Sequence, residues 1–440
     1  DDVESRGLGD VYKRQTLFAF GIFAICFSGW IFRQSTDREK LFWDNTIRCE
    51  TKELKEGEIK SENIALPEDF DVPKSILFKT THTIAEVWLD GEKIYEYGNE
   101  ADAPGFMKTP GSCWHIVDIP GDSSGKNLEV RIIPVYEGYY GNEVSLVYGT
   151  RGDCILKILT DSLGILVISC GILFAAVICI LLYCGAARRK RSDKTEAKIE
   201  IFLNLGFFSL LVAVWTLVQC GFLQFLIPDG RTLYFVEYFS LFLFPVPFNF
   251  LLYDICKSRY HKGALIFSIL YLTNMAVDVL LQWTGIIDMS RLLSVIHVIM
   301  VANVVYTVVI ILYEAGKKEN DVAQKFRYPM CVVMGFGMAE MIFYYLRRFE
   351  QISILLSMGT MLFIIMLIWI QVSQYYDQYI QKQKVIYLQK IANMDMLTEA
   401  MNRNAYEDMV KYLDEGEIKL STTGLSLIHI SEPTRLDVIS

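Results

Sequence analysis

Apolar runs of about twenty residues recur along this 440-residue chain, and they constrain its fold more than any other feature. A helix needs roughly 20 apolar residues to cross the roughly 30 Å hydrocarbon core of a bilayer. The overall hydrophobic share of 52% would also suit a large soluble protein, whereas its concentration in such runs would not. The runs predict a polytopic α-helical membrane protein with about eight spans, at residues 16–32, 157–184, 200–226, 232–254, 263–284, 291–313, 328–346 and 352–373.

Basic residues near the ends of the spans predict the orientation of the chain, because cytoplasmic connections carry an excess of Lys and Arg. They gather after the second, fourth and sixth spans, at residues 188–198, 257–262 and 317–327. We therefore expect these connections and the segment after residue 373 to be cytoplasmic, and residues 33–156 to lie outside. Arg347-Arg348, on an outer connection, contradicts this pattern.

Both ends of the chain look foreign to the rest of it. Residues 5–15 can be encoded by one stretch of DNA, and residues 425–435 can be encoded by its reverse complement. Two segments that complementary DNA strands can encode resemble a sequencing adapter that has been translated in frame at both ends. We therefore expect residues 1–15 and 425–440 to be adapter-derived and non-native, and we take 16–32 as a membrane anchor or signal segment.

The outer segment, residues 33–156, is long enough for one independent core. Residues 84–90 and 127–133 alternate apolar and polar side chains, which is the period of a strand with one buried face. Asp90-Gly91 between such runs predicts a two-residue hairpin turn, since glycine accepts a positive φ. Together with frequent Gly and Pro, these signals predict an antiparallel β-sandwich.

The charge of this outer segment limits its partners. Residues 33–155 contain 14 Lys and Arg against 23 Asp and Glu, and the whole chain carries a net charge of −9. An acidic surface repels phosphate groups, so neither nucleic acid nor anionic lipid is expected as its ligand.

Four short motifs of the outer segment resemble, in the same order, the jelly-roll, galactose-binding-like sugar-binding domain of family 2 glycosidases. They are Ala-Glu-Val-Trp-Leu-Asp-Gly at 85–91, Tyr-x-x-Gly at 95–98, Trp-x-x-x-Asp-Ile-Pro at 114–120 and the alternating run at 128–132. The resemblance implies a jelly-roll fold and, more weakly, a carbohydrate ligand. Aromatic rings that stack on sugars are candidate ligand contacts here, or else core and cross-strand packing: Trp88, Trp114, Tyr136, Tyr139 and Tyr140. His115 is either a pH sensor or an ordinary hydrogen-bonded histidine.

The seven spans of residues 157–373 resemble in their organisation the bacterial seven-transmembrane receptors with diverse intracellular signalling modules. That resemblance implies a bacterial inner-membrane receptor with an extracellular β-domain before the helices and an output domain after them. Polar groups within the spans, Glu237, Asp278 and Glu340 among them, are either an ion or substrate path or interhelical hydrogen-bond partners. Pro245 and Pro247 predict a kink in their span.

A signalling helix is expected at residues 374–392, which contain no Gly or Pro. Val372, Tyr379 and Ile386 repeat at intervals of seven, as in a coiled-coil seam, over only about two heptads. The run is therefore either a homodimer contact or a solvated extension of the last span.

The residues that follow match the opening of the GGDEF diguanylate cyclase domain at seven positions: Asp395, Leu397, Thr398, Asn402, Arg403, Tyr406 and Glu407. Glu399 and Ala400 depart from the family's usual Gly-Leu. The resemblance implies that residues 393–424 begin a truncated α/β domain. Asp395 and Arg403, eight residues apart around the turn into its first helix, are candidates for an ionic latch. The family holds Mg or Mn on acidic residues of an Asp-x-Asp-x-Phe segment and a Gly-Gly-Asp/Glu-Glu-Phe turn, and neither motif occurs in 393–424. No catalytic residue, metal ligand or cofactor is therefore assigned to this chain.

These features predict a multi-pass receptor whose extracellular ligand, an unidentified small molecule, controls a cytoplasmic diguanylate cyclase that makes cyclic di-GMP from two GTP. The expected partners are the lipid bilayer, that ligand and a second copy of the chain. A histidine-kinase output is less consistent, because 373–424 contain no histidine. A non-catalytic output and a transporter with an extracellular binding domain remain as alternatives.

Overall fold

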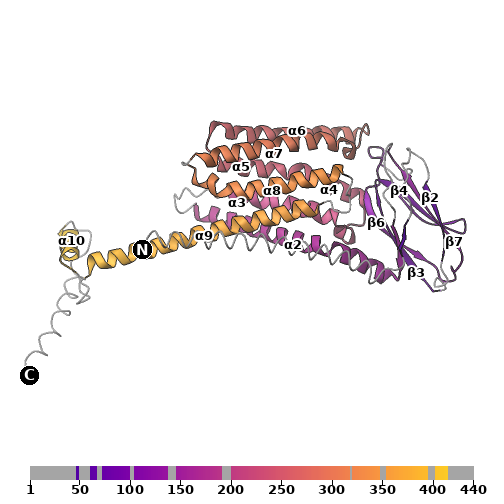
Figure 1. Cartoon of the computed structure of the whole chain (residues 1–440), viewed down its shortest axis with the longest axis horizontal. Helices are drawn as coiled ribbons and strands as arrows, with labels where there is room; N and C mark the ends of the chain where they lie inside the picture. The colour runs from indigo at the N-terminus through magenta and orange to yellow at the C-terminus, as the bar shows by residue number, and fades with distance from the viewer. Residues whose placement is uncertain are drawn as a thin grey trace, which may run out of the picture. The chain divides into compact units, whose positions relative to one another are not determined.

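The computed structural model describes residues 46–48, 60–66, 72–99, 104–136, 145–190, 200–317, 320–346, 353–394 and 402–414. The chain divides into two units, residues 1–367 and 368–440. The first unit holds two small sheets and most of the helices, which Figure 1 shows running side by side.

The eight strands form two four-stranded antiparallel sheets. The first sheet has the order β1 (Thr46–Arg48), β8 (Ser145–Gly149), β3 (Lys74–Thr81) and β6 (Ser112–Ile119). The second has the order β2 (Lys60–Ala65), β7 (Asn127–Pro134), β4 (Thr83–Leu89) and β5 (Glu92–Tyr97).

One apolar core lies between the two sheets. Ile76 and Phe78 of β3 enter it from the first sheet, and Val87 and Val130 enter it from the second. Burial alternates along β4, so Ala85, Val87 and Leu89 point inward as the sequence predicted. The sequence-based expectation of an antiparallel domain with period-two strands is therefore confirmed.

The predicted hairpin turn is also confirmed. β4 and β5 pair directly, with Leu89 opposite Glu92. Asp90 and Gly91 between them have φ angles of 45° and 86°. Two successive positive φ values are the signature of the type I′ turn, which an Asp-Gly pair favours.

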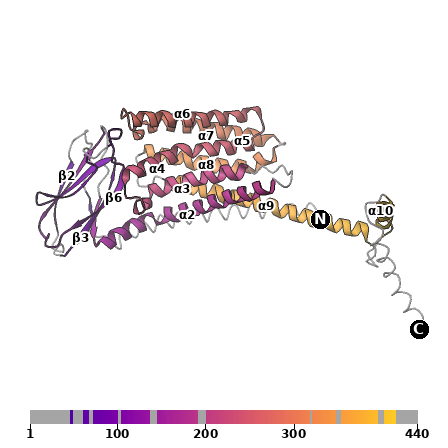
Figure 2. The same cartoon turned by 180° about the vertical axis from the view of Figure 1, so that it is seen from behind.

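Twelve helical elements follow the sheets in the described residues. They are α2 (Arg151–Lys190), α3 (Glu200–Gln219), η3 (Phe222–Phe225), α4 (Gly230–Leu243), α5 (Pro245–Ile255), η4 (Arg259–His261), α6 (Lys262–Trp283), η5 (Met289–Leu292), α7 (Leu293–Gly316), α8 (Asp321–Tyr345), α9 (Ile354–Asn393) and α10 (Arg403–Asp414). Figure 2 shows α2 leaving the sheets and running along α3.

Several of these helices have the length and composition of membrane spans. Within the described residues, five segments qualify: Arg151–Arg188, Glu200–Gln219, Gly230–Ile255, Arg259–Trp283 and Met289–Gly316. Ile354–Ile370 is a shorter apolar stretch. The chain therefore has the character of a membrane protein, and the span expected at 16–32 lies outside the described residues.

Two helix boundaries differ in detail from the sequence-based expectation. The run expected at 200–226 ends as an α-helix at Gln219, because Gly221 adopts a φ of 73° and the chain continues as the short helix η3. A glycine in this left-handed conformation commonly ends a helix. The run expected at 232–254 is two helices, α4 and α5, which meet at Phe244 just before Pro245. Phe244 between them keeps φ and ψ angles of −61° and −28°, so the interruption before Pro245 is confined to this residue.

Buried polar side chains pair between helices. Asn303 Nδ2 of α7 donates to Asn249 Oδ1 of α5 at 2.8 Å. Glu340 of α8 accepts hydrogen bonds from the backbone N–H groups of Ser353 and Leu356, where α9 begins. These contacts favour the structural interpretation of the polar groups over a conduction path.

Basic connections share one end of the helical bundle, the end opposite the sheets. The backbone N–H groups of Lys257 and Ser258, between α5 and α6, donate to Glu314 at the end of α7. Asn320, just before α8, donates to the Ile255 carbonyl at 3.0 Å. The connections 257–262 and 317–327 therefore meet at the same end, as their shared excess of Lys and Arg predicted. Arg347 and Arg348 lie outside the described residues.

Candidate functional site

The sheets rest on the helices through the outer face of the first sheet. Leu77 of β3 and Val147 of β8 form a buried apolar cluster with Cys154 and Ile158 of α2. Because α2 begins at Arg151, two residues after β8 ends at Gly149, the sheet and the helix are joined almost without a linker. A displacement of this sheet would therefore act directly on α2.

A loop between β5 and β6, residues 104–111, reaches into the end of the bundle, and we call it the docking loop. The Phe106 ring stacks on Trp283 of α6, with ring centroids 5.3 Å apart. Met107 is buried in the same cluster as Tyr234 of α4 and Leu293 of α7. The docking loop thus fills the space where three helices would otherwise present an open apolar end.

Asp288, which lies between α6 and η5, accepts hydrogen bonds from the docking loop and from its neighbours. Its carboxylate accepts from the Gln282 side-chain amide at 2.6 Å, from the Lys108 backbone N–H at 3.3 Å and from the Tyr136 hydroxyl. Gln282 also donates to the Phe106 carbonyl at 2.6 Å. Asp288 is 5% exposed, so the charge is stabilised mainly by these donors.

A second polar contact joins β6 to η3. The Trp114 backbone N–H donates to Gln224 Oε1 at 2.8 Å, and Gln224 Nε2 donates back to the Trp114 carbonyl at 2.6 Å. The glutamine amide thereby occupies the hydrogen-bonding position of a neighbouring strand at this sheet edge. We use the term junction for the docking loop, Asp288 and its partners, and this Trp114–Gln224 pair.

The junction contains two of the five aromatic residues that were candidate ligand contacts. The Trp114 ring is half-buried in the cluster between sheet and α2, and Tyr136 donates to Asp288. Both rings therefore contact protein at the helices. Tyr139 and Tyr140 lie outside the described residues.

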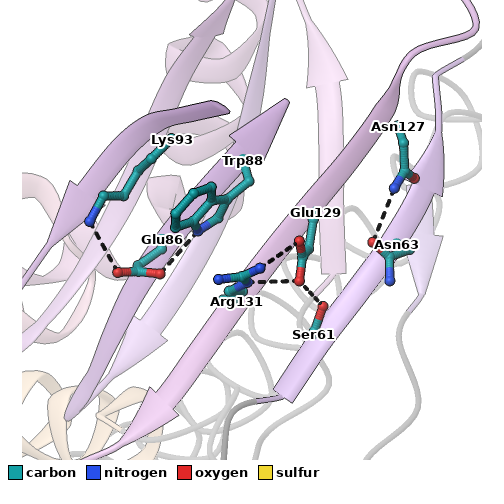
Figure 3. A network of polar contacts seen from close by, with 8 residues as sticks. All are labelled: Ser61, Asn63, Glu86, Trp88, Lys93, Asn127, Glu129 and Arg131. Carbon is teal, nitrogen blue, oxygen red and sulfur yellow. Dashed lines mark hydrogen bonds and ion pairs between the residues drawn. The ribbon is translucent and has the colours of Figure 1, made fainter. Parts of the chain in front are cut away.

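Trp88 lies on the opposite side of the domain, on the outer face of the second sheet, within the polar network that Figure 3 shows. Its indole N–H donates to Glu86 at 3.0 Å. The Arg131 guanidinium lies 4.4 Å from the ring centroid and Lys93 Nζ lies 5.5 Å from it. Because these cations come from the two neighbouring strands, the ring already has partners on this face, and it is a poorer platform for a sugar than the sequence suggested.

The rest of this network is a chain of side-chain contacts across the strands. Glu129 accepts a hydrogen bond from Ser61 and pairs with Arg131 at 2.7 Å, as Figure 3 shows. Asn127 donates to Asn63 at 3.2 Å. The Arg131 contact and the Ser61 hydrogen bond lower the pKa of Glu129. The Ser61 and Asn63 contacts join β2 to β7, whereas Glu129 and Arg131 are two residues apart on β7 itself. Such contacts are ordinary stabilisers of a solvated sheet face.

His115 is a core residue. It is 1% exposed, its Nε2 lies 2.6 Å from Thr80 Oγ1, and its Nδ1 lies 2.9 Å from the Tyr95 hydroxyl. Burial lowers the pKa of His115 to about 3, so the ring is neutral at physiological pH. Of the two roles considered from the sequence, the hydrogen-bonded histidine fits this environment, because a sensor would have to titrate near neutral pH.

The buried histidines predict how the stability of the sheets depends on pH. Burial also lowers the pKa of His82 to about 4, while Asp288 opposes this shift. The unfolded chain protonates these rings near the ordinary pKa of 6.5, and the folded chain does not, so the unfolded state binds more protons below pH 6.5. Stability should therefore fall as the pH drops from 6.5 toward 4, by up to about 1.4 kcal/mol per pH unit for His115.

Denaturant unfolding of the sheets, followed by tryptophan fluorescence between pH 7 and pH 4, measures this slope. In His115→Gln the slope should become shallower, whatever the absolute stability of the variant. An unchanged slope in that variant would contradict a neutral, buried His115.

In the second unit, Asn402 begins α10 as an N-cap. Its Oδ1 accepts from the Ala405 N–H at 3.0 Å, and its side-chain amide donates to the Ala392 carbonyl at 2.5 Å. Arg403 pairs with Glu407 at 2.8 Å within the same exposed helix. The expected latch cannot be placed, since Asp395, Leu397 and Thr398 lie outside the described residues.

The described part of the chain offers no group of three or more His, Cys, Asp or Glu residues arranged to hold a metal ion. In the segment that resembles the cyclase opening, residues 402–414 form an N-cap and one exposed helix.

The comparisons with known proteins give the junction no precedent: no family model, no curated protein and no solved structure matches this chain. Its function therefore has to be inferred from its own residues.

Proposed function

We propose that this chain is the sensory and membrane-spanning part of a bacterial inner-membrane receptor. In this proposal the sheets bind an extracellular small molecule, and the helices pass the signal to a cytoplasmic diguanylate cyclase that begins near residue 393. The junction is the observation that carries the proposal, because it fixes a binding-type domain to the helices through buried polar bonds rather than through a flexible linker.

The strand order supports the jelly-roll part of this proposal. Sheets ordered 1-8-3-6 and 2-7-4-5 are what two interlocked Greek keys produce from eight antiparallel strands. Jelly-roll domains of lectins and related proteins bind small ligands, but the fold alone does not identify one.

The basic connections support the orientation. They lie at the end of the bundle away from the sheets, where positively charged loops are retained in the cytoplasm. The sheets would then face the outside, and the end of α9 would face the cytoplasm.

The packing of α9 supports a role for this helix as the output element. Ile364 of α9 is buried with Ile172 of α2 and Ala213 of α3, and Phe363 meets Phe208 of α3 with ring centroids 6.1 Å apart. The same helix then continues without a break to Asn393. A displacement of α2 relative to α3 that begins at the sheets would change how α9 packs against these two helices.

The mechanism that follows is a two-state equilibrium of the bundle. A ligand that binds one arrangement of sheets and helices more tightly shifts the population toward it, and only that difference in affinity can drive the signal. The exposed side chains of Tyr379 and Ile386, seven residues apart on α9, fit a second copy of the chain, so the shift would alter how two output domains face each other.

Sequencing the native gene beyond the codon for Gly424 tests the proposed output. We expect an open reading frame with an Asp-x-Asp-x-Phe segment and a Gly-Gly-Asp/Glu-Glu-Phe turn within about 150 codons, the size of one domain. A frame of that length without the turn would contradict the cyclase assignment.

A further inference from the structure

Two exposed tyrosines meet at the end of the bundle away from the sheets, where α7 ends and α6 begins. Tyr260 of η4 and Tyr313 of α7 have ring centroids 5.9 Å apart, with the ring planes inclined at 76°. Both side chains are exposed. The Tyr306 hydroxyl donates to the Tyr260 carbonyl at 2.7 Å, which holds η4 against α7. The fold therefore keeps the two rings together while leaving them accessible.

A cation lies beside each ring of this pair. Arg259 Cζ is 5.1 Å from the centroid of Tyr260, and Arg259 Nη2 donates to the Tyr260 hydroxyl at 3.1 Å. Lys317 Nζ is 4.4 Å from the centroid of Tyr313. Both cationic side chains are exposed. These four residues form one continuous surface in the order cation, ring, ring, cation, and we call them the basic tyrosine cluster.

The carboxylate next to this cluster in the chain is turned away from its surface. Glu314 of α7 is 1% exposed and accepts hydrogen bonds from the backbone N–H groups of Lys257 and Ser258 and from the side-chain amide of Asn320. These three donors compensate much of its charge. The side chain of Lys257 is itself exposed and adds a third cation. The surface here is therefore positive and favours an anionic partner.

Exposed apolar side chains continue from the cluster along α7. Val305 and Val309 precede Tyr313 at intervals of four residues, so the three side chains share one face of the helix, and both valines are exposed. Ile266 and Ile269 are exposed near the start of α6, which Figure 1 shows beside α7. A partner that fits this whole surface has an anionic end for the cluster and long apolar chains for the helices.

We propose that the basic tyrosine cluster binds the head group of an anionic phospholipid of the surrounding bilayer. The lipid phosphate would accept hydrogen bonds from Arg259 and Lys317, whose exposed side chains can turn from the rings toward it. A charge-assisted bond to phosphate is stronger than an exposed contact between a cation and a ring, so the exchange is favourable. The acyl chains would lie along the exposed apolar face of α7.

This inference goes beyond the proposed receptor function, because it involves neither an extracellular ligand nor a cyclase. It requires only that α6 and α7 span a bilayer. A lipid that contacts η4 and α7 at once would also stabilise the pairing of α6 with α7.

The surface distinguishes an anionic phospholipid from two related ligands. A soluble phosphate would pair with the cations but would gain nothing from the apolar side chains of α7. Phosphatidylcholine carries its own ammonium group, which the cations of the cluster would repel. Only a lipid with a net negative head group satisfies both parts of the surface.

Native mass spectrometry of the purified chain tests the site. Phosphatidylglycerol or phosphatidylcholine is titrated into the detergent micelles, and the lipid-bound fraction gives an apparent affinity. We expect saturable binding of phosphatidylglycerol, much weaker binding of phosphatidylcholine, and little displacement by inorganic phosphate or glycerol phosphate. Each cation contributes a factor of about five at an anionic lipid surface, so Arg259→Gln together with Lys317→Gln should weaken the binding roughly 30-fold.

Matched variants separate the site from a general attraction to anionic lipid. Arg188→Gln together with Lys325→Gln removes the same two charges from exposed positions at the same end of the bundle, on α2 and α8, and should leave the affinity unchanged. Arg259→Lys together with Lys317→Arg keeps both charges and should retain most of the binding. All these side chains are exposed, so every variant should unfold at the parent temperature in phosphatidylcholine nanodiscs.

Several outcomes would overturn the proposal. They are equal affinity for the two lipids, displacement of phosphatidylglycerol by inorganic phosphate at the same concentration, parent-like binding when both Arg259 and Lys317 are replaced by glutamine, and an equal loss in the variant of α2 and α8. If the double glutamine variant fails to fold, Arg259→Gln and Lys317→Gln are compared singly, and each should weaken the binding about fivefold. Unchanged affinity in both single variants would likewise contradict the site.

Discussion

Replacing Asp288 by alanine should release the docking loop from the helices. The variant leaves the Gln282 amide, the Lys108 N–H and the Tyr136 hydroxyl without their shared acceptor in a buried position. A buried donor that loses its partner costs about 1–3 kcal/mol. Gln282 keeps the Phe106 carbonyl as an acceptor and Lys108 is exposed, so the folded state should lose roughly 2–3 kcal/mol. Thermal unfolding of the purified chain in nanodiscs measures this loss.

Limited trypsin digestion reports on the same variant locally. Lys108 is exposed but lies on the docking loop, so cleavage after it requires the loop to leave the bundle. Asp288→Ala should markedly increase the rate of this cleavage. Asp288→Asn keeps one acceptor oxygen, so its cleavage rate should lie between those of Asp288→Ala and the parent chain. Asp321→Ala removes an exposed carboxylate from the start of α8 and serves as the control. Parent-like unfolding and cleavage in Asp288→Ala would show that Asp288 does not hold the junction.

Replacing Glu340 by alanine should loosen the start of α9. Glu340 is 6% exposed, and its carboxylate accepts from the backbone N–H groups of Ser353 and Leu356 at the positive end of this helix. Removing the acceptor leaves those donors buried and unpaired, at a cost of roughly 2–4 kcal/mol. The first turn of α9 should therefore exchange its amide hydrogens faster, as hydrogen–deuterium exchange followed by mass spectrometry would detect.

The variant Glu340→Gln separates charge from hydrogen bonding at this position. It retains an acceptor oxygen and should recover most of the protection that Glu340→Ala loses. Exchange in α6, which does not contact Glu340 through any described hydrogen bond, should stay unchanged in both variants. If the amide hydrogens of residues 353–358 exchanged at the parent rate in Glu340→Ala, apolar packing alone would hold the start of α9 in place.

Local sequence patterns predicted the parts of the fold that depend on neighbouring residues. The Asp90-Gly91 turn follows from backbone conformations that few residue pairs adopt, and the alternation of β4 follows from one buried face. The interruption at Pro245 follows from the missing N–H and the fixed φ of proline. Each of these signals lies within about ten residues of the chain, so no tertiary information was needed.

The junction could not be predicted in this way. Trp114 and Gln224 are 110 residues apart, and Tyr136 and Asp288 are 152 apart, so no local pattern connects them. The aromatic side chains of Trp114 and Tyr136 suit both ligand binding and packing, and only the fold distinguishes these uses.

Labelling with a membrane-impermeant maleimide tests most directly whether the sheets and the end of the chain lie on opposite sides of a bilayer. Single cysteines replace Glu92, exposed at the start of β5, and Lys411, exposed on α10, and the signal of the parent chain is subtracted. In intact cells position 92 should react at once, and position 411 should react only after the membrane is permeabilised. Reaction at 411 with protection at 92 would contradict the receptor account.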